Sequence, residues 1–212
     1  MKRIELEGMV LGMLGTNCYF IVNTETEEIV IVDPADEADV IKNWCLNHQK
    51  KPVAILLTHG HYDHILAAEA VREAFSVKIY AAETEKELLE NASYNLSAMW
   101  SRPVTLRADE FVKDGERLHL AGTEIEVIAT PGHTAGGVCY YIKEAGTLLS
   151  GDTLFAGSYG RTDFPTSSMA ALARSVRERL FRLPEETAVY PGHGESTSIG
   201  YEKRYNPLSG GA

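Results

Sequence analysis

The feature that most constrains this chain is a short apolar run that ends in a dense group of histidines. The run "VAILLT" (Val53–Thr58) has the length and continuous apolar character of a strand covered on both faces. It leads directly into "HGHYDH" (His59–His64), which holds three of the seven histidines and an aspartate. His59 and His61 point the same way in an extended segment, because side chains alternate. The fold must therefore gather polar side chains at the end of a buried strand.

Three further segments repeat this placement. The runs "IEVIATPGHT", "TLLSGDTLF" and "TAVYPGHG" each end a strand-like stretch and then offer, after a glycine, His133, Asp152 and His193 respectively. Glycine lets the backbone approach a crowded centre, and ligand sites gather at strand ends in α/β sheets. Five histidines and two aspartates in equivalent loops predict a metal site, and imidazole with carboxylate suits zinc, iron or manganese. His48 and His119 fall outside this pattern, and we expect no role for them in the site.

Apolar patterning predicts one α/β domain with sheet inside and helices outside. Continuous or alternating apolar runs predict strands in "CYFIV", "EIVIVD", "VAILLT", "VKIYA", "EIEVIAT", "GVCYYI", "TLLSGD" and "TAVYPGHG". Helical spacing predicts helices over Glu37–His48, Asp63–Phe75, Glu83–Glu90 and Met169–Arg182. In the first of these helices, Val40, Ile41, Trp44 and Cys45 are expected to share one face. Residues 91–103 have no clear period and are predicted to form a loop.

Composition excludes several classes of function. The formal net charge of -10 argues against a nucleic-acid partner, because phosphate binding needs clustered Lys and Arg. Three widely spaced cysteines without a CxxC pair argue against disulfides and thiolate metal sites. No stretch approaches the roughly 20 apolar residues of a membrane span, and the N-terminus does not have the pattern of a signal peptide. We therefore expect a cytoplasmic protein with no membrane partner and no obligate protein partner.

The histidine pattern resembles that of a known family. "THGHYDH", with Gly-His133, Gly-Asp152 and Gly-His193 downstream, is similar to the metal-binding pattern of the metallo-β-lactamase superfamily. The resemblance covers nearly the whole chain, including "GTNCYFIV" and "IVDP", and it implies an αββα sandwich with metals between the sheet edges. "GRTDFP" (Gly160–Pro165) and "PGHGESTSIGYEKRYNP" (Pro191–Pro207) further resemble the short glyoxalase II-like hydrolases.

The resemblance implies a role for each residue of the pattern. His59, His61 and His133 would hold one divalent transition metal, and Asp63, His64 and His193 would hold a second. Asp152 would bridge the two, giving two metals per chain, with zinc expected first and iron or manganese as alternatives. Asp33, in "IVDP", would be a carboxylate that orients a ligand imidazole. The alternative for Asp33 is an ordinary turn residue at a strand end.

The sequence departs from the family pattern at three points. Leu66 stands where glycine usually follows "DHI". "GRTDFP" stands where full-length glyoxalase II enzymes have a loop bearing Lys and Tyr. We expect residues 1–212 to form a single domain of this fold, without the C-terminal helical domain with which full-length glyoxalase II binds glutathione. These departures bear on which thiol the protein would accept.

The expected activity is hydrolysis of a small-molecule thioester, such as S-lactoylglutathione or a related acyl thiol. A dinuclear centre would supply a metal-bridging hydroxide as nucleophile and stabilise the oxyanion that forms. Asp152 would act as the bridge and Asp63 as a ligand that relays a proton to the leaving group. A non-catalytic binding module is disfavoured, because all seven ligands are present.

A mononuclear-iron dioxygenase acting on glutathione persulfide is the alternative activity. That family shares the ligand set and "GRTDF", but it would bind one iron through His59, His133 and Asp152. Pro165 after "GRTDF" and the "PGHG" around His193 favour the hydrolases.

Substrate contacts are predicted from the loop "AGSYGRTD", which follows Asp152 closely. Arg161 is the candidate for contact with a substrate anion, the alternative being a structural pair with Asp163. Tyr159 is expected to flank the same mouth. In the loop 91–103, Tyr94, Met99 and Trp100 are candidates for an apolar wall, although core packing is the favoured role for Trp100.

Overall fold

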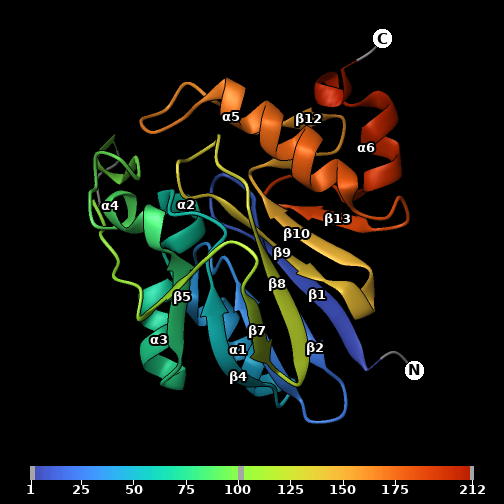
Figure 1. The fold of residues 1–212 in the computed structure, drawn as a ribbon. Coiled ribbons are helices and arrows are strands. Elements are labelled where there is room, and N and C mark those ends of the chain that lie inside the picture. Colours follow the sequence, from blue (N-terminus) through green and yellow to red (C-terminus); the bar gives the residue numbers. More distant parts are fainter. Residues whose placement is uncertain (1–2, 100–102, 211–212) are drawn as a thin grey trace.

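A computed structural model describes residues 3–99 and 103–210. Within these residues the chain forms two six-stranded sheets and a small two-stranded hairpin. The first sheet has the order β1-β2-β3-β4-β5-β6 and the second β14-β13-β10-β9-β8-β7. In Figure 1 the first sheet carries the blue and green half of the chain and the second mainly the yellow to red half. The strand order of each sheet therefore follows the chain, half by half.

The first half of the chain supplies these elements: β1 (Ile4–Leu11), β2 (Thr16–Asn23), β3 (Glu28–Val32), α1 (Ala38–Asn47), β4 (Lys51–Leu56), α2 (Tyr62–Ile65), α3 (Ala68–Phe75), β5 (Lys78–Ala82), α4 (Lys86–Leu89) and β6 (Glu110–Val112). The second half supplies β7 (Arg117–Leu120), β8 (Thr123–Ala129), β9 (Val138–Ile142), β10 (Thr147–Gly151), β11 (Leu154–Phe155), β12 (Ser158–Tyr159), α5 (Met169–Arg174), β13 (Ala188–Pro191), β14 (Thr197–Ser198) and α6 (Ile199–Tyr205). Single 3₁₀ or π turns, η1–η6, connect several of them.

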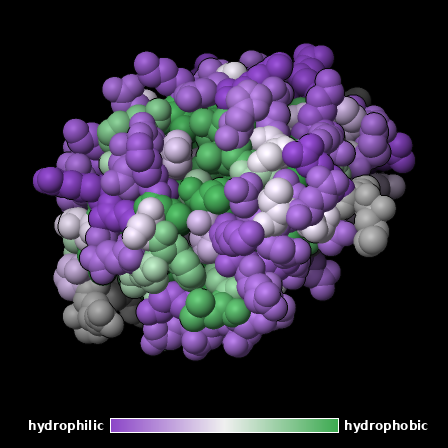
Figure 2. Space-filling model, turned by 90° about the horizontal axis from the view of Figure 1, so that it is seen from below, coloured by the Kyte–Doolittle hydropathy of each residue, from purple (hydrophilic) through white to green (hydrophobic). Residues whose placement is uncertain are grey.

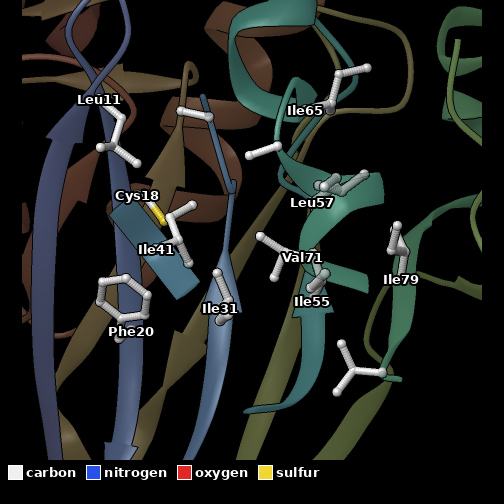
Figure 3. Close-up of a cluster of buried hydrophobic side chains, with 14 of the residues drawn as sticks. Leu11, Cys18, Phe20, Ile31, Ile41, Ile55, Leu57, Ile65, Val71 and Ile79 are labelled. Carbon is white, nitrogen blue, oxygen red and sulfur yellow. The ribbon is translucent and has the colours of Figure 1, made fainter. Parts of the chain in front are cut away.

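Three apolar clusters hold the layers together. One cluster lies between the two sheets, where Ile21 and Leu56 of the first sheet meet Val127 and Tyr140 of the second. Another lies between the first sheet and helices α1 and α3, as Figure 3 shows for its central side chains. The last lies between the second sheet and the segment from α5 to α6. The layers therefore run helix, sheet, sheet, helix, which is the predicted αββα sandwich (Figure 1).

The end of the sandwich seen from below is closed by apolar side chains. Figure 2 shows them gathered in the centre of that face, with hydrophilic side chains around them. At the upper end of the cluster in Figure 3, Leu11 and Ile65 mark where β1 and α2 approach the loops described below. The polar loops and the apolar end thus occupy opposite edges of the two sheets.

Several elements differ from those predicted. The helix expected over Asp63–Phe75 is two helices, α2 and α3, because the backbone N–H of Ala67 donates to the carbonyl of Pro34 rather than within a helix. The helix over Met169–Arg182 passes through a π turn (Ser175–Arg179) and a 3₁₀ turn. Glu83–Glu90 likewise combines a 3₁₀ turn with the short α4. The strands that were not predicted at all are β1, β6, β7, β11, β12 and β14, and helix α6 was also missed.

One core residue was also placed wrongly. Ile41 and Cys45 of α1 are fully buried and Trp44 stacks on Phe20 with ring centroids 4.2 Å apart. Val40, however, is 47% exposed. It lies about 100° around the helix from Ile41, which takes it off the buried stripe.

No helix in residues 3–99 and 103–210 combines the length and apolar character needed to cross a membrane.

Tyr140→Phe tests the link between the sheets. The buried Tyr140 hydroxyl donates to the Leu57 carbonyl at 2.8 Å, at the end of β4. Removing this donor leaves a buried carbonyl lone pair without its partner, so we expect the free energy of unfolding to fall by about 1–2 kcal/mol. Urea denaturation measures it, with Tyr205→Phe at a 65% exposed position as control. Equal stability of both variants would contradict the role of this hydrogen bond.

Candidate metal centre

The predicted ligands come together from both sheets at one edge of the sandwich. The loop after β4 carries His59 and His61, and helix α2 directly after it carries Asp63 and His64. The loops after β8, β10 and β13 carry His133, Asp152 and His193 respectively. Among the described residues, three groups of potential ligand atoms form, each with all atoms within 4.8 Å of one another; one of them joins Asp33 to His59 and His64, and the other two contain only predicted ligands. These two are His59, His61 and His133, and Asp63, His64 and His193, which is the division implied by the family resemblance.

The three-histidine group is buried and electrically neutral. His59, His61 and His133 are each 3–5% exposed, and Nδ1 of His61 lies 2.8 Å from Nε2 of His133. Burial lowers the pKa of His61 to about 3, with His133 adding to the effect. Burial also lowers the pKa of His59 and of His133. A neutral imidazole has a free lone pair, which is the form that binds a transition metal.

The second group brings a carboxylate between two imidazoles. Oδ2 of Asp63 lies 3.2 Å from Nε2 of His193 and 3.5 Å from Nε2 of His64. Burial acts to raise the pKa of the Asp63 carboxyl, but His64 and His193 outweigh it and hold that pKa below its usual range. Burial likewise acts to lower the pKa of His64, and Asp63 and Asp152 outweigh it and raise that pKa. Asp63 is therefore anionic and ready to serve as a ligand.

Asp152 lies between the two groups. Its Oδ1 is 3.4 Å from Nε2 of His64, and its Oδ2 is 3.5 Å from Nε2 of His133 and 3.6 Å from Nε2 of His193. Burial acts to raise the pKa of its carboxyl, but the imidazoles around it, His64 first, lower it. One carboxylate thus faces both ligand groups, as a bridging ligand must.

Unpartnered polar atoms at the centre fit metal ions. Nε2 of His59, His61 and His64 and Oδ1 of Asp152 are buried without a hydrogen-bond partner among the described residues. Buried polar atoms are nearly always partnered, because an unsatisfied one costs about 1–3 kcal/mol. Four such atoms in one centre, all of types that bind zinc, iron or manganese, fit two metal ions. His59, His61 and His133 would hold one of them and Asp63, His64 and His193 the other.

Asp33 fixes the orientation of the His64 imidazole through the ring nitrogen that faces away from the centre. Its Oδ1 accepts the backbone N–H of Thr58 at 2.7 Å, and its Oδ2 accepts the Thr58 hydroxyl at 2.6 Å and Nδ1–H of His64 at 2.9 Å. The residue has φ 49°, a left-handed conformation that Asp tolerates. Such a bond to the far nitrogen sets the tautomer and leaves Nε2 of His64 facing the centre.

Two of the predicted glycines allow a close backbone approach. A Cβ on Gly192 would lie 2.2 Å from Oδ1 of Asp152, and one on Gly132 would lie 2.3 Å from the backbone of Leu172. Neither position has room for a side chain. The glycines before His193 and His133 therefore let those loops pack against the centre and against α5.

Glu85 is a buried support that the sequence did not reveal. It is 1% exposed, its Oε1 accepts the N–H of Gly60 at 3.0 Å, and its Oε2 packs against Gly136. It thereby joins the backbone between His59 and His61 to the loop that follows His133. Burial raises the pKa of the Glu85 carboxyl to about 7. A glutamate in a short helical segment gives no such signal in the sequence.

Thr16 is a second support of this kind. Its hydroxyl donates to Oδ2 of Asp63 at 3.0 Å, across 47 residues of sequence. Thr16 also forms an isolated bridge with His193, so the start of β2 contacts the second ligand group.

The predicted substrate residues lie along the loop after Asp152. Arg161 is exposed and its guanidinium pairs with Asp163 at 2.7 Å, with its Cζ 4.3 Å from the Phe164 ring centroid. The Arg161 carbonyl accepts Nδ1–H of His133 at 2.8 Å. Tyr159, in β12, is half-buried and packs against the cluster beneath α5. A contact of either side chain with substrate stays a prediction.

Phe164 was missed by the sequence reading and lies beside the first ligand group. Its ring centroid is 5.3 Å from that of His61 and 6.0 Å from that of His133. An aromatic edge at this distance shields the imidazoles from water on that side. Of the predicted apolar wall, Trp100 lies outside the described residues, and Met99 is 80% exposed.

The chain was compared with known proteins. The model of the metallo-β-lactamase superfamily matches residues 11–193. The chain belongs to the metallo-β-lactamase superfamily. Two curated relatives in this superfamily are a probable metallo-hydrolase, YqgX, of Bacillus subtilis and the hydroxyacylglutathione hydrolase GloC of Haemophilus influenzae. YqgX is 38% identical over 96% of both chains, and GloC is 34% identical over 91% of this chain and 92% of its own.

Solved structures of the superfamily have the same fold. BLEG-1, a B3 metallo-β-lactamase, superposes with a TM-score of 0.93 at 38% identity, covering 98% of this chain and 100% of its own. TTHA1623 in a di-iron-bound form superposes with a TM-score of 0.84 at 35% identity, covering 95% of this chain and 99% of its own. ETHE1 from Myxococcus xanthus superposes with a TM-score of 0.82 at 28% identity, covering 98% of this chain and 86% of its own. A short glyoxalase II-like member of the superfamily is consistent with these matches.

Asp152→Ala tests the bridge. The variant removes the one carboxylate that faces both groups, so bound metal should fall from about two ions per chain to about one or fewer. Elemental analysis after loading with zinc and desalting measures this. His119→Ala, at a strand position outside the centre, is the control and should keep its metal. Undiminished metal in Asp152→Ala would show that Asp152 is not a ligand.

Glu85→Gln tests the buried glutamate. The folded pKa of about 7 exceeds the ordinary 4.5, so its protonated form stabilises the fold below pH 4.5 and this contribution is lost as the pH rises to 7. Glutamine keeps the acceptor for Gly60 and cannot ionise. The stability of the variant relative to the wild type should therefore increase through this window, by roughly 2–3 kcal/mol in total.

Denaturation of metal-free protein between pH 5 and 8 provides the measurement, and Glu73→Gln at an exposed position is the matched control. A pH-independent difference for Glu85→Gln would mean that this carboxyl does not change its proton affinity on folding.

Proposed function

We propose that this metallo-hydrolase family member hydrolyses thioesters at a dinuclear metal centre. The observation that carries the proposal is the pair of adjacent ligand groups with Asp152 between them. A mononuclear site on His59, His133 and Asp152 would leave Asp63, His64 and His193 without a metal, and of these His64 is fully buried. A dinuclear site gives every one of the seven side chains a partner.

Two bound metal ions would supply Lewis acidity, lowering the pKa of a water molecule and polarising the acyl carbonyl. The protein contributes the rest. Asp33 and Glu85 hold the loops of the ligands in place, and Phe164 excludes water beside His61 and His133. Asp63, with its side chain 14% exposed at the mouth, is the group that passes a proton to the departing sulfur.

The reaction consumes one water molecule. A C–O bond forms at the acyl carbon, the C–S bond breaks, and the thiol leaves with one proton while the acid product releases the other. Two divalent cations would outweigh the two carboxylates of Asp63 and Asp152, so a metal-loaded centre would favour the negative charge that develops on the acyl oxygen. This charge balance supports acyl transfer to water within a chain of net charge -10.

The comparisons support a thioester of the glyoxalase II kind. GloC is named a hydroxyacylglutathione hydrolase and aligns over nine-tenths of the chain. For the metal, we propose zinc first, while the di-iron form of TTHA1623 supports iron as the alternative. Three buried free cysteines fit a reducing compartment, so we propose the cytoplasm as the location.

A second candidate is oxidation of glutathione persulfide at a single iron. The observation that favours it is "GRTDF", whose Arg161 carbonyl contacts His133. Pro165 and the "PGHG" around His193 favour hydrolysis instead. The two reactions differ in their need for oxygen, which gives a direct test.

His193→Ala and anaerobic assay together decide between them. The wild type loaded with zinc should release free thiol from S-lactoylglutathione at the same rate with and without oxygen. His193→Ala removes a ligand of the second group, so kcat should fall by about 100-fold or more. His48→Ala, at the C-terminal end of α1, is the control and should keep full activity. Thiol release is followed with a chromogenic thiol reagent.

Oxygen uptake on glutathione persulfide, dependence on iron alone and no thiol release from any thioester would overturn the hydrolase proposal.

A further inference from the structure

A cavity opens beside the second ligand group, between the turn that joins β1 to β2 and helix α2. Asp63 and Thr16 form its inner end, next to the centre. Most of the remaining wall is apolar and consists of Leu11, Met13, Leu14, Leu66 and Val104. The cavity therefore borders the second ligand group at Asp63.

The apolar side chains of this wall are unusually open to water. Met13 is 88% exposed and Leu14 48% exposed, and Val10 just before them is 68% exposed. Exposed apolar side chains gathered around a cavity mark a binding surface rather than a fold requirement. Leu11 lines the cavity and also belongs to the apolar cluster beneath it (Figure 3).

The charge of the cavity selects the kind of ligand. Among the described residues that line it, the charged ones are Asp36 and Asp63, and both are acidic. Asp63 belongs to the proposed metal centre, so a carboxylate that extends along the outer part of the cavity would meet Asp36 and no Lys or Arg among these lining residues. The arm of a substrate that occupies this cavity is therefore uncharged.

Its volume limits how much of a substrate enters. The cavity measures about 260 Å³, slightly below the range of roughly 300–1,000 Å³ typical of pockets that enclose a whole small molecule. It therefore accommodates one arm of a thioester, with the other arm on the side of His61 and Phe164.

We propose that this cavity binds an apolar acyl chain, so that the preferred substrates are thioesters of aliphatic acids. Leu14 and Leu66 set this preference from opposite walls. Leu66 is half-buried at the end of α2 and adds an apolar side chain where the resemblance implies glycine. The inference rests on the proposed thioester hydrolysis and adds to it the class of acyl group.

Chain length tests the proposal with the thiol held constant. Thioesters of N-acetylcysteamine, a neutral thiol, are assayed from acetyl to octanoyl with the zinc-loaded protein. We expect kcat/KM to rise roughly fourfold for each methylene that enters the cavity, and then to level off. Leu14→Ala and Leu66→Ala should each lower the ratio of kcat/KM for the hexanoyl thioester to kcat/KM for the acetyl thioester by roughly five- to tenfold.

Leu46→Ala is the matched control, because Leu46 is a 67% exposed leucine on α1 away from the cavity. This variant should leave kcat/KM unchanged for both the acetyl and the hexanoyl thioester. Saturation-transfer NMR with S-hexyl-N-acetylcysteamine, a thioether that cannot be hydrolysed, gives a readout without turnover. Its hexyl protons should receive saturation from the wild type, and the transfer should weaken in Leu14→Ala.

The possible failures are separable. Equal kcat/KM for acetyl and hexanoyl thioesters, with no selective loss in the two variants, overturns the acyl cavity and leaves thioester hydrolysis standing. If no thioester is hydrolysed, the proposed function fails. NMR contact with the hexyl chain that weakens in Leu14→Ala would then still support the cavity, and no contact would overturn it.

Discussion

The structure depends on gathering seven polar side chains at one edge of two sheets, four of them buried imidazoles. Burial alone would make this set unstable, because isolated buried charges and unpaired imidazoles are costly. Here the carboxylates of Asp63 and Asp152 remain ionised only because imidazoles surround them. Several donor and acceptor atoms still lack partners, and metal ions of the proper size and softness would satisfy them. The buried carboxylate of Asp33, behind His64, must also be partnered. It accepts three hydrogen bonds, one of them from His64, and thereby fixes the orientation of that imidazole.

The double sheet makes this centre possible. The first sheet contributes the four ligands of one loop, and the second contributes His133, Asp152 and His193 from three loops. Neither sheet alone carries both complete groups, so packing of the two sheets and assembly of the centre are one event. The buried bond from Tyr140 to Leu57 spans this junction and lies just before the first ligand loop. Stability of the sandwich and geometry of the site are therefore coupled.

The centre meets two different environments. On the side of His61 and His133 it is bordered by the aromatic ring of Phe164, above which the Arg161–Asp163 pair lies. On the side of Asp63 it opens to a cavity with apolar walls and acidic charges. A thioester has the same asymmetry, with a thiol arm and an acyl arm on either side of the reacting carbon. The asymmetry of the site supports a substrate with two chemically distinct arms.

Local patterns in the sequence determined a large part of this. Apolar runs ending in glycine and histidine predicted the strands of the core and the metal ligands, because each is a local pattern of residues with a fixed chemical preference. Tertiary contacts decided the features that no local pattern of residues predicted. Apolar and polar residues alternate too weakly in the edge strand β1 for it to be recognised. The break between α2 and α3 follows from the hydrogen bond of the Ala67 N–H to the Pro34 carbonyl. Three residues contact the centre from segments dozens of residues away in the sequence: Thr16, Glu85 and Phe164. The sequence by itself determined which side chains are of a type that can bind metal. Only the packing of two sheets decided which of them lie close enough to share an ion and what surrounds them, because those distances are set by contacts between segments far apart in the chain.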